Sequence, residues 1–338
     1  MSGPVSVLPE VAAALAGGRP VVALESTLIA HGLPAPRNLS VALDLEARLR
    51  DRGVTPATIG VVDGVPTVGL DRAGLEIMAG AGGGAGPDPG PSGEEPGRGG
   101  KEQGHVEEQG RGVAKASVRD LPVLLANGRS AATTVAATSY LAWRAGVRVF
   151  ATGGLGGVHR GAASSYDESA DLVALSRTPV AVVCAGVKSI LDVAATLERL
   201  ESLGVTVVGY GTNRFPGFYL HDSGHPVEWR VDGPEAVARV MAAADGLGLT
   251  GAVVVANPVP LAEQLDPDLY QGVLAEALAA AEAKGLRGKE VTPFLLDHIQ
   301  AGTGGASLEA NVAAVVNNVE VAAGVARAWA ALGPGRGR

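Results

Sequence analysis

The sequence predicts an α/β fold in which a mostly parallel central sheet is covered by helices within a single domain. Short runs of four or five residues, rich in valine, are typical of buried strands. Longer segments with helical spacing of apolar residues separate these runs, and such alternation favours a parallel sheet. The chain has 338 residues and no internal repeat or clear domain boundary, so we expect one domain over 1–338 with a sizeable core.

Strand and helix patterns divide most of the chain. The predicted strands are Pro20–Leu24, Val147–Ala151, Val180–Cys184, Val205–Val208 and Ala252–Val255. The predicted helices are Asn38–Arg52, Val118–Asn127, Thr134–Ala145, Ser189–Leu203, Pro234–Leu247, Asp268–Lys284 and the Ala/Val-rich Ser307–Leu332. A β-hairpin is expected over Ala57–Leu70, because Asp63-Gly64 is a favoured two-residue turn.

Composition excludes several classes of protein. Hydrophobic residues make up 46% of the chain and charged residues 18%, which is too apolar for a disordered protein. No apolar run reaches the roughly 18–20 residues of a membrane helix, and no signal peptide is visible. The formal net charge of −8 argues against nucleic acid as the main partner. Cys184 is the single cysteine, which excludes a disulfide framework, so we expect a cytoplasmic enzyme that binds neither nucleic acid nor membranes.

One segment, Gly80–Gly112, differs from the rest of the chain. Its 33 residues include 13 Gly and 4 Pro, and Val106 is its only aliphatic residue larger than alanine. Such a composition cannot bury a core. We therefore expect 80–112 to be a disordered surface loop inserted into the domain.

Three polar residues follow predicted strands directly or closely. Glu25 follows the first strand, Thr152 follows Val147–Ala151, and Lys188 lies just beyond Val180–Cys184. In open α/β sheets, ligands bind beyond the carboxyl ends of the strands. These three side chains are therefore candidates for one site.

Lys188 is the most informative of the three. Only five of the 27 basic residues are lysine, so a lysine in an apolar setting suggests a role that arginine cannot fill. Desolvation there favours a neutral amine, which can attack a carbonyl carbon. The alternative is an ammonium group that pairs with a carboxylate or a phosphate.

The sequence leaves two roles open for each of the other candidate residues. Glu25 is suited to move protons at a strand end that faces a pocket, although it could also cap the following segment. Lys115 could contact a phosphate or form a surface salt bridge. His31 could shuttle protons, but its setting favours a hydrogen-bonded structural histidine.

A glycine-rich loop, Gly153–Gly157, follows Thr152. Its backbone N–H groups could approach an anion, with His159 nearby to complete a phosphate cradle. The loop matches neither of the two common nucleotide-binding fingerprints, and glycine-rich loops also occur for purely geometric reasons. Both interpretations stay open from the local sequence.

A cluster of carboxylates comes shortly afterwards. Asp167, Glu168 and Asp171 lie within five positions, just before an apolar helical run. Acidic residues and serine favour helix N-termini, which would make this a capping segment. The alternative is a hard divalent cation, Mg²⁺ or Mn²⁺, held by one or two carboxylates and water.

Taken together, these segments resemble the pseudouridine-5′-phosphate glycosidases, also called indigoidine synthase A-like proteins. The matching runs appear in family order over nearly the whole chain outside the insert. They are ALESTLIAHGLPAPRN (23–38), PATIGVVDGVPTVGL (56–70), KASVRDLP (115–122), ATTVAAT (132–138), FATGGLGGVHRGA (150–162), DESADL (167–172), VVCAGVKSILD (182–192), LESLGVTVVGY (200–210), ANPVP (256–260), GKEVTPFLL (288–296) and SLEANVAAVVNN (307–318).

The resemblance implies an α/β/α layered fold, a homotrimer and a Mn²⁺-dependent lyase. Such enzymes reversibly cleave the C–C glycosidic bond of pseudouridine 5′-phosphate to uracil and ribose 5-phosphate. Lys188 matches the covalent nucleophile, Glu25 the proton donor and Asp167 the metal ligand. The matched substrate-binding positions are Lys115, Val135, Thr152, His159, Ser169, Ala170, Asp171 and Asn311.

The implied chemistry explains the residue types. A C–C glycosidic bond has no heteroatom leaving group, so an imine between Lys188 and C1′ of the opened ribose is expected to serve as the electron sink. The alternatives are a Schiff-base lyase or aldolase for another phosphosugar, and a catalytically silent sugar-phosphate sensor. Two departures from the family pattern are the insert before Lys115 and Glu168, which adds a charge beside Asp167.

Overall fold

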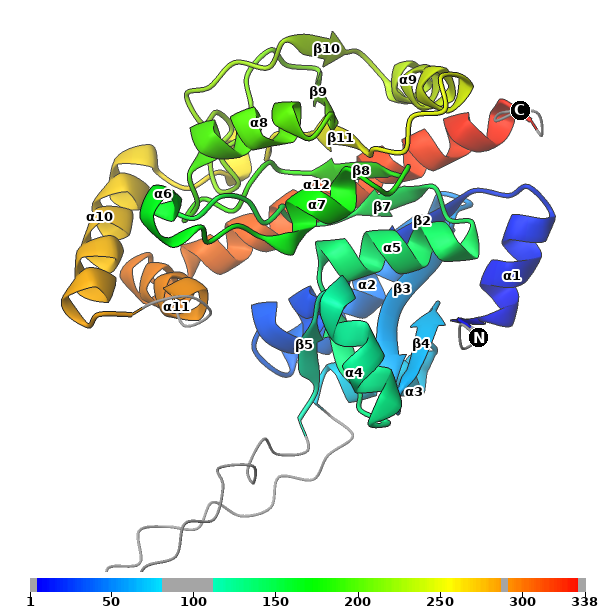
Figure 1. Ribbon diagram of the computed structural model, residues 1–338, viewed down its shortest axis with the longest axis horizontal. Helices are drawn as coiled ribbons and strands as arrows, with labels where there is room; N and C mark the ends of the chain where they lie inside the picture. The colour runs from blue at the N-terminus through cyan, green and yellow to red at the C-terminus, as the bar shows by residue number, and fades with distance from the viewer. Residues whose placement is uncertain (1–4, 81–111, 287–290, 334–338) are drawn as a thin grey trace, which may run out of the picture.

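The computed structural model describes residues 5–80, 112–286 and 291–333 (Figure 1). Almost all of the predicted loop lies, as 81–111, outside the described residues, so that prediction is untested. Within the described residues, none of the helices combines the length and the apolar character needed to span a bilayer.

Among the described residues, eleven strands form one sheet. Its main path runs in the order β1 (Ser6–Val7), β4 (Val65–Val68), β3 (Thr55–Val62), β2 (Val21–Leu24), β7 (Val149–Ala151), β8 (Ala181–Cys184), β11 (Val253–Ala256), β9 (Thr206–Tyr210) and β10 (Trp229–Val231). Off this path, β5 (Ala114–Ala116) pairs with β6 (Ala131–Thr133), which also pairs with β3. Among the pairings between these described strands, only β3–β4 and β3–β6 are antiparallel. The sheet is therefore mostly parallel, as the sequence predicts.

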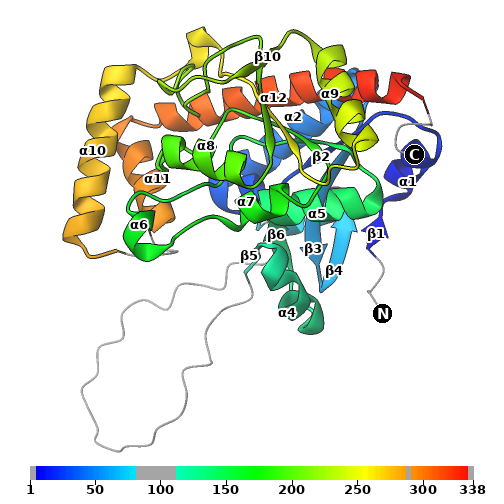
Figure 2. The same cartoon turned by 45° about the horizontal axis from the view of Figure 1, so that its top comes forward.

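Helices cover both faces of this sheet (Figures 1 and 2). One face packs against α1 (Pro9–Ala16), α5 (Val135–Ala145), α7 (Ala170–Leu175) and α8 (Val193–Ser202). The other face packs against α2 (Arg37–Asp51), α9 (Pro234–Gly246) and α12 (Ala306–Ala331). The remaining helices are α3 (Arg72–Met78), α4 (Leu121–Ala126), α6 (Ala162–Ser165), α10 (Pro267–Ala283), α11 (Val291–Gly302), a π-helix (Leu28–Gly32) and two 3₁₀ turns (Val118–Asp120, Leu261–Glu263). The predicted α/β/α layering is confirmed.

Most predicted elements are confirmed, and one helix differs in a way that matters for the site. The predicted strands agree with the observed strands to within two residues. The hairpin turns at Asp63 and Gly64, which both have positive φ, as its turn type requires. The helix predicted from Ser189 begins only at Val193, because Asp192 caps it by accepting a hydrogen bond from Ala195 N at 3.0 Å. Lys188 is therefore in a turn between β8 and α8.

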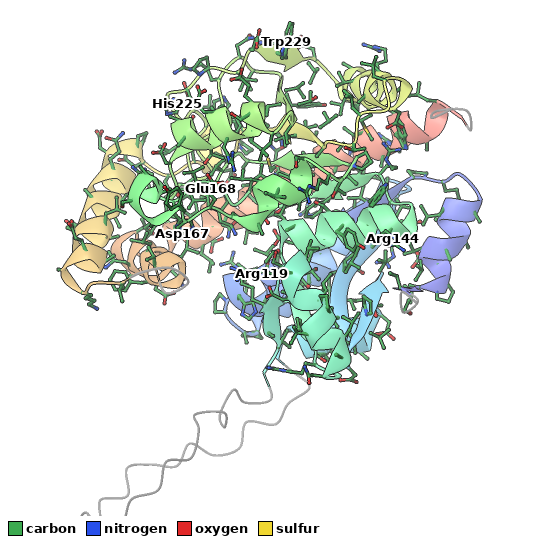
Figure 3. All side chains as sticks on the ribbon, in the orientation of Figure 1. Arg119, Arg144, Asp167, Glu168, His225 and Trp229 are labelled. Atoms are coloured by element: carbon green, nitrogen blue, oxygen red, sulfur yellow. The ribbon has the colours of Figure 1, made fainter. Side chains whose placement is uncertain are left out.

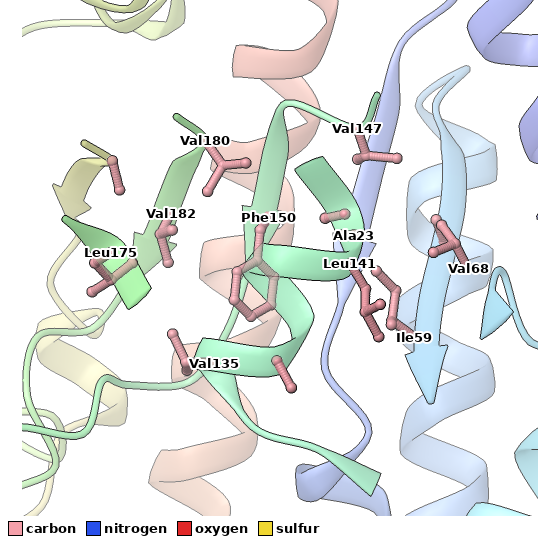
Figure 4. Packing of buried hydrophobic residues seen from close by; sticks show 14 of the residues in the cluster. Ala23, Ile59, Val68, Val135, Leu141, Val147, Phe150, Leu175, Val180 and Val182 are labelled. Carbon is pink, nitrogen blue, oxygen red and sulfur yellow. The ribbon is translucent and has the colours of Figure 1, made fainter. Parts of the chain in front are cut away.

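Phe150 lies at the centre of the core on the α5 and α7 side (Figure 4). It is fully buried on β7, with Leu141, Leu175 and Val182 in the same cluster. Removal of a buried aromatic ring loses its transfer free energy and leaves a cavity. The side chain therefore contributes to the stability of the sheet that carries the site.

We predict that Phe150→Ala lowers the free energy of unfolding by about 3–5 kcal/mol, which is typical of such cavities. Urea denaturation followed by circular dichroism measures this change. The control is Val123→Ala on α4, whose side chain is 63% exposed; it should change stability by less than about 0.5 kcal/mol. Equal effects of the two substitutions would contradict the described core.

Candidate active site

Two adjoining cavities lie beyond the carboxyl ends of β2, β7 and β8. The large chamber, of about 360 Å³, is walled by the π-helix, Gly153–Gly154, Phe218–Tyr219, α11 and α12. The small chamber, of about 170 Å³, is walled by the 167–171 segment, the start of α5 and the turn after Lys188. The walls of both chambers include Glu25, Thr27, Lys115 and Lys188. These four residues therefore mark where the chambers meet.

The structure brings nearly all predicted site residues to these chambers. Glu25, Lys115 and Lys188 border both chambers, and Asn311 borders the large one. The small chamber is lined by Val135, His159, Asp167, Ser169, Ala170 and Asp171. Thr152 differs from the others, because it is 1% exposed and lies behind Glu25 rather than on either wall.

Glu25 is held by two hydroxyl groups. The hydroxyl of Thr27 donates to Glu25 Oε2, and that of Thr152 donates to Glu25 Oε1. The turn that presents Glu25 is fixed by Ser26, whose Oγ donates to Ile59 O at 2.6 Å and accepts from Thr133 N at 2.9 Å. Each carboxylate oxygen thus has a donor, and the group faces both chambers in a fixed orientation.

Lys188 is positioned by its backbone. Its N–H donates to Leu155 O at 3.0 Å, and its carbonyl accepts from Leu191 N at 2.9 Å. Two residues earlier, Gly186 has a φ of +88°, and a Cβ there would collide with the carbonyl oxygen of Pro216. Only glycine fits this approach. The half-buried Lys188 side chain is therefore carried by a tightly packed turn rather than by a helix.

Lys115 shares the junction with Lys188. Desolvation, followed by the positive charge of Lys188, lowers the pKa of Lys115, while the carboxylates of Glu25 and Asp171 act in the opposite direction. Desolvation, followed by the charge of Lys115, lowers the pKa of His31 in the large chamber. The junction therefore places two amines beside the Glu25 carboxylate, with Asp171 in the wall of the small chamber, as expected for a site that transfers protons.

The glycine loop is explained in part by close packing. A Cβ at Gly156 would overlap Ser169, and one at Gly157 would overlap Thr196. Asp171, only 5% exposed, accepts from Gly156 N at 2.8 Å and from Ala136 N at 2.9 Å. Asp171 thus ties the loop to the start of α5, and the Gly156 amide already has an acceptor. The geometric interpretation of these glycines is therefore supported.

Residues that sequence reasoning missed add hydroxyl groups to the walls. Thr134 occupies the N-cap position of α5 and borders the small chamber, and within the described residues its buried Oγ1 has no hydrogen-bond partner. Helix N-termini and unpartnered hydroxyl groups both favour an anion, although Asp171 already accepts from the Ala136 amide in this first turn. Thr27 was also missed. Their positions in the ATTVAAT and ALEST runs were visible, but their orientation was not.

Asp167 is the carboxylate best placed to hold a cation. Figure 3 shows Asp167 and Glu168 side by side on the segment between α6 and α7. The Glu168 carboxylate accepts from Arg199 Nε at 2.9 Å, so its charge is balanced by that arginine. Asp167 is about one-third exposed, and its Oδ2 lies 3.9 Å from His159 Nδ1.

The donor set around Asp167 fits a hard divalent ion that keeps most of its water. Within 5–80, 112–286 and 291–333, no group of three His, Cys, Asp or Glu side chains forms a metal cluster. A single carboxylate with water ligands is the usual protein contribution to Mg²⁺, and Mn²⁺ favours the same ligands. The residues present therefore fit a largely hydrated ion better than a closed protein cage.

Comparison with known proteins places this chain in a family. The sequence model of the indigoidine synthase A like proteins matches residues 10–85 and 97–328, and the gap between the two stretches falls within the insert. A pseudouridine-5′-phosphate glycosidase from Frankia alni is 58% identical over 94% of this chain and 80% of its own length. One from Saccharopolyspora erythraea is 55% identical over 95% of this chain and 96% of its own length.

Solved structures agree with the sequence comparison. The prealnumycin C-glycosynthase AlnA in complex with ribulose 5-phosphate superimposes with a TM-score of 0.82 and 33% identity, covering 97% of both chains. An indigoidine synthase A-like protein from Thermotoga maritima gives a TM-score of 0.77 and 34% identity, covering 91% of this chain and 92% of its own. By both sequence and fold, the chain belongs to the indigoidine synthase A-like protein family.

Proposed function

We propose that this protein reversibly cleaves the C–C glycosidic bond of pseudouridine 5′-phosphate, giving uracil and ribose 5-phosphate. The observation that carries the proposal is the junction of the two chambers, where Lys188 and Glu25 face the same space. Relatives at 55–58% identity that bear the name of this activity support it. The two chambers also suit a nucleotide-sized ligand, since small-molecule sites measure roughly 300–1,000 Å³.

The ribose 5-phosphate half of the substrate fits the small chamber best. Lys115 supplies a cation, the N-terminus of α5 at Val135 supplies backbone donors, and Thr134 and Ser169 supply hydroxyl groups. The uracil half then lies in the large chamber beside Asn311, whose amide can both donate to and accept from the edge of the base. This placement brings C1′ to the junction.

At the junction, Lys188 acts as the nucleophile. Its amine nitrogen bonds to C1′ as the C1′–O4′ bond opens, and O4′ takes a proton from Glu25. Glu25, now a carboxylate, takes a proton from the new C1′–N ammonium group and delivers it to C5 of the base. The nitrogen lone pair then forms the C1′=N bond and the C1′–C5 bond breaks. The released electron pair restores the C5=C6 double bond of uracil. Water then hydrolyses the imine, which releases ribose 5-phosphate and regenerates the amine.

We further propose that Asp167 would hold a largely hydrated Mn²⁺ ion. The ion would supply a fixed positive charge and an ordered hydration shell that orient the phosphorylated sugar. His159 Nδ1, at 3.9 Å from Asp167 Oδ2, would contact that hydration shell. Lys188 and Glu25 carry out the bond-breaking steps.

We predict that Asp167→Asn raises the Mn²⁺ concentration for half-maximal activity by about tenfold or more, because even outer-shell changes alter metal affinity on that scale. A metal titration of the initial rate measures this shift. The control is Glu168→Gln, next in sequence but paired with Arg199, for which less than about a twofold change is expected. Equal shifts in both variants would show that Asp167 does not hold the metal ion.

The quaternary state and location of the protein are also proposals. The family resemblance supports a homotrimer in the cytoplasm, and the net charge of −8 gives no support for nucleic acid as a partner. Light scattering coupled to gel filtration measures the mass of the assembly. A monomeric or dimeric mass would contradict the trimer.

The reaction is tested most simply in the synthetic direction. The purified protein is incubated with ribose 5-phosphate, uracil and Mn²⁺, and pseudouridine 5′-phosphate is sought by chromatography. We expect the product to form and its formation to stop on chelation. If folded, metal-loaded protein forms no product, the proposed reaction is wrong. Covalent capture of the sugar that does not depend on uracil would then favour a Schiff-base lyase for another phosphosugar.

A further inference from the structure

A chain of buried polar side chains leads from α12 to Glu25. Asn318 is completely buried, Thr152 is 1% exposed and Asn257, just after β11, is 4% exposed. Asn318 Nδ2 donates to the main-chain carbonyl of Thr152 at 2.7 Å, and the Thr152 hydroxyl donates to Glu25. Asn318 Oδ1 accepts from Asn257 Nδ2 at 2.9 Å. The Asn318 side chain thus connects the segment that follows β7 with the segment that follows β11. Through Thr152 it is also linked to the segment that follows β2.

The position of Asn318 is unusual for this helix. The neighbouring residues that α12 buries are apolar, among them Val315, Val319 and Ala322. A buried amide costs free energy unless its donor and its acceptor are both used. Here both are used, because Asn318 donates to the backbone carbonyls of Thr152 and, at 3.5 Å, of Gly153, and accepts from the Asn257 amide. The asparagine therefore holds Thr152 and Asn257 in a defined arrangement.

The same helix reaches the large chamber. Asn311 lies seven residues before Asn318, which is about two helical turns and places both on one face. Asn311 also packs against Gly153, since a Cβ there would be 3.1 Å from Asn311 Oδ1. One rigid element thus sets the wall of the large chamber and the residue that holds Glu25.

We propose that Asn318 is a positioning residue: it fixes Thr152, and through the Thr152 hydroxyl it fixes the Glu25 carboxylate at the junction of the chambers. The inference rests on the proposed function, which gives Glu25 the proton-transfer step. Asn257 supports the arrangement by holding the other end of the Asn318 amide.

The first test compares two neighbouring asparagines. Asn318→Asp keeps the shape and the acceptor for Asn257 but replaces the donor to Thr152 with an oxygen. We expect kcat to fall about 10²-fold, because a displacement of a reacting group by about 1 Å can cost that much in rate. KM for ribose 5-phosphate should stay within about twofold of its original value. The matched control is Asn317→Asp, because Asn317 Nδ2 donates to Pro258 O at 3.0 Å and does not join the Thr152 chain. Equal losses in the two variants would overturn the proposal.

A double-mutant cycle separates positioning from general stability. In a Glu25→Gln background, Asn318→Asp should cost less than about twofold further, because coupled residues are not additive. A second full loss in that background would show that Asn318 acts independently of Glu25, which overturns the proposal. If Asn318→Asp does not fold, Asn318→Leu, which is similar in volume and uncharged, replaces it in the cycle.

A crystal structure of the same variant provides a readout that does not need activity. We expect the Glu25–Thr152 hydrogen bond to be lost and the carboxylate to shift relative to Lys188. An unmoved carboxylate that keeps its Thr152 contact would overturn the positioning role. If the unmutated protein makes no pseudouridine 5′-phosphate, the proposed function fails, and the crystal structure still decides whether Asn318 positions Glu25.

Discussion

Lys188→Arg is expected to abolish turnover, with a loss of about 10⁴-fold or more, the scale seen when an enzyme loses its nucleophile. Arginine keeps the positive charge and much of the length of the side chain. Its guanidinium stays protonated, however, and cannot attack C1′. The half-buried side chain borders both chambers, which leave room for the guanidinium group, so the fold should be retained.

The neighbouring lysine provides the matched control for this substitution. Lys115 borders the same junction, and its proposed role is that of a cation toward the phosphate. Arginine can fill that role, so Lys115→Arg should keep measurable turnover. Circular dichroism of both variants measures whether the fold is retained, and initial rates measure turnover. Retained activity in Lys188→Arg would remove the imine mechanism, and complete loss in both variants would leave the nucleophile unassigned.

Glu25→Gln is expected to lower kcat by about 10²–10⁴-fold, the usual contribution of a general acid or base. The amide keeps the size of the side chain and can still contact Thr27 and Thr152. It cannot supply the proton that O4′ needs, so ring opening slows while substrate binding is spared. Steady-state kinetics should therefore show a lower kcat with little change in KM.

A surface glutamate serves as the control for Glu25. The Glu76 side chain is 41% exposed and pairs with Arg72 one helical turn away, an interaction that contributes little to stability. Glu76→Gln should leave kcat within about twofold of the original value. If Glu25→Gln behaves in the same way, Glu25 does not move protons in the rate-limiting step.

The sequence was sufficient to predict the fold and the strand-end residues of the site. Buried valine-rich runs mark the strands, and parallel strands place their carboxyl ends at one edge. Glu25 and Lys188 could therefore be expected to lie close together before any coordinates were known. The start of α8 could not be predicted from apolar spacing, because the Asp192 cap decides it.

The contribution of Lys115 depends on tertiary pairing. Its strand, β5, pairs with β6, and β6 reaches the main sheet only by antiparallel pairing with β3. Neither pairing follows from the short sequence AKA. The family resemblance implied a substrate contact, but the closeness of Lys115 to Lys188, which helps to lower the pKa of Lys115, required the structure.

Thr152 and Asn318 show a second limit of sequence reasoning. The position of Thr152 at a strand end was predicted, whereas its hydroxyl contact with Glu25 depends on how β7 lies beside β2. Asn318 is visible in the sequence as a polar residue in an Ala/Val-rich helix. Its partners, Thr152 and Asn257, depend on how α12 crosses the sheet, which no local pattern encodes.

Trapping of the imine tests whether Lys188 is the covalent nucleophile. The protein is incubated with ribose 5-phosphate and reduced with borohydride, and the modified peptide is identified by mass spectrometry. We expect one reduced sugar-phosphate adduct per chain, located on Lys188 and absent from Lys188→Arg. An adduct on Lys115 instead, or no adduct in a preparation that makes pseudouridine 5′-phosphate, would contradict the mechanism.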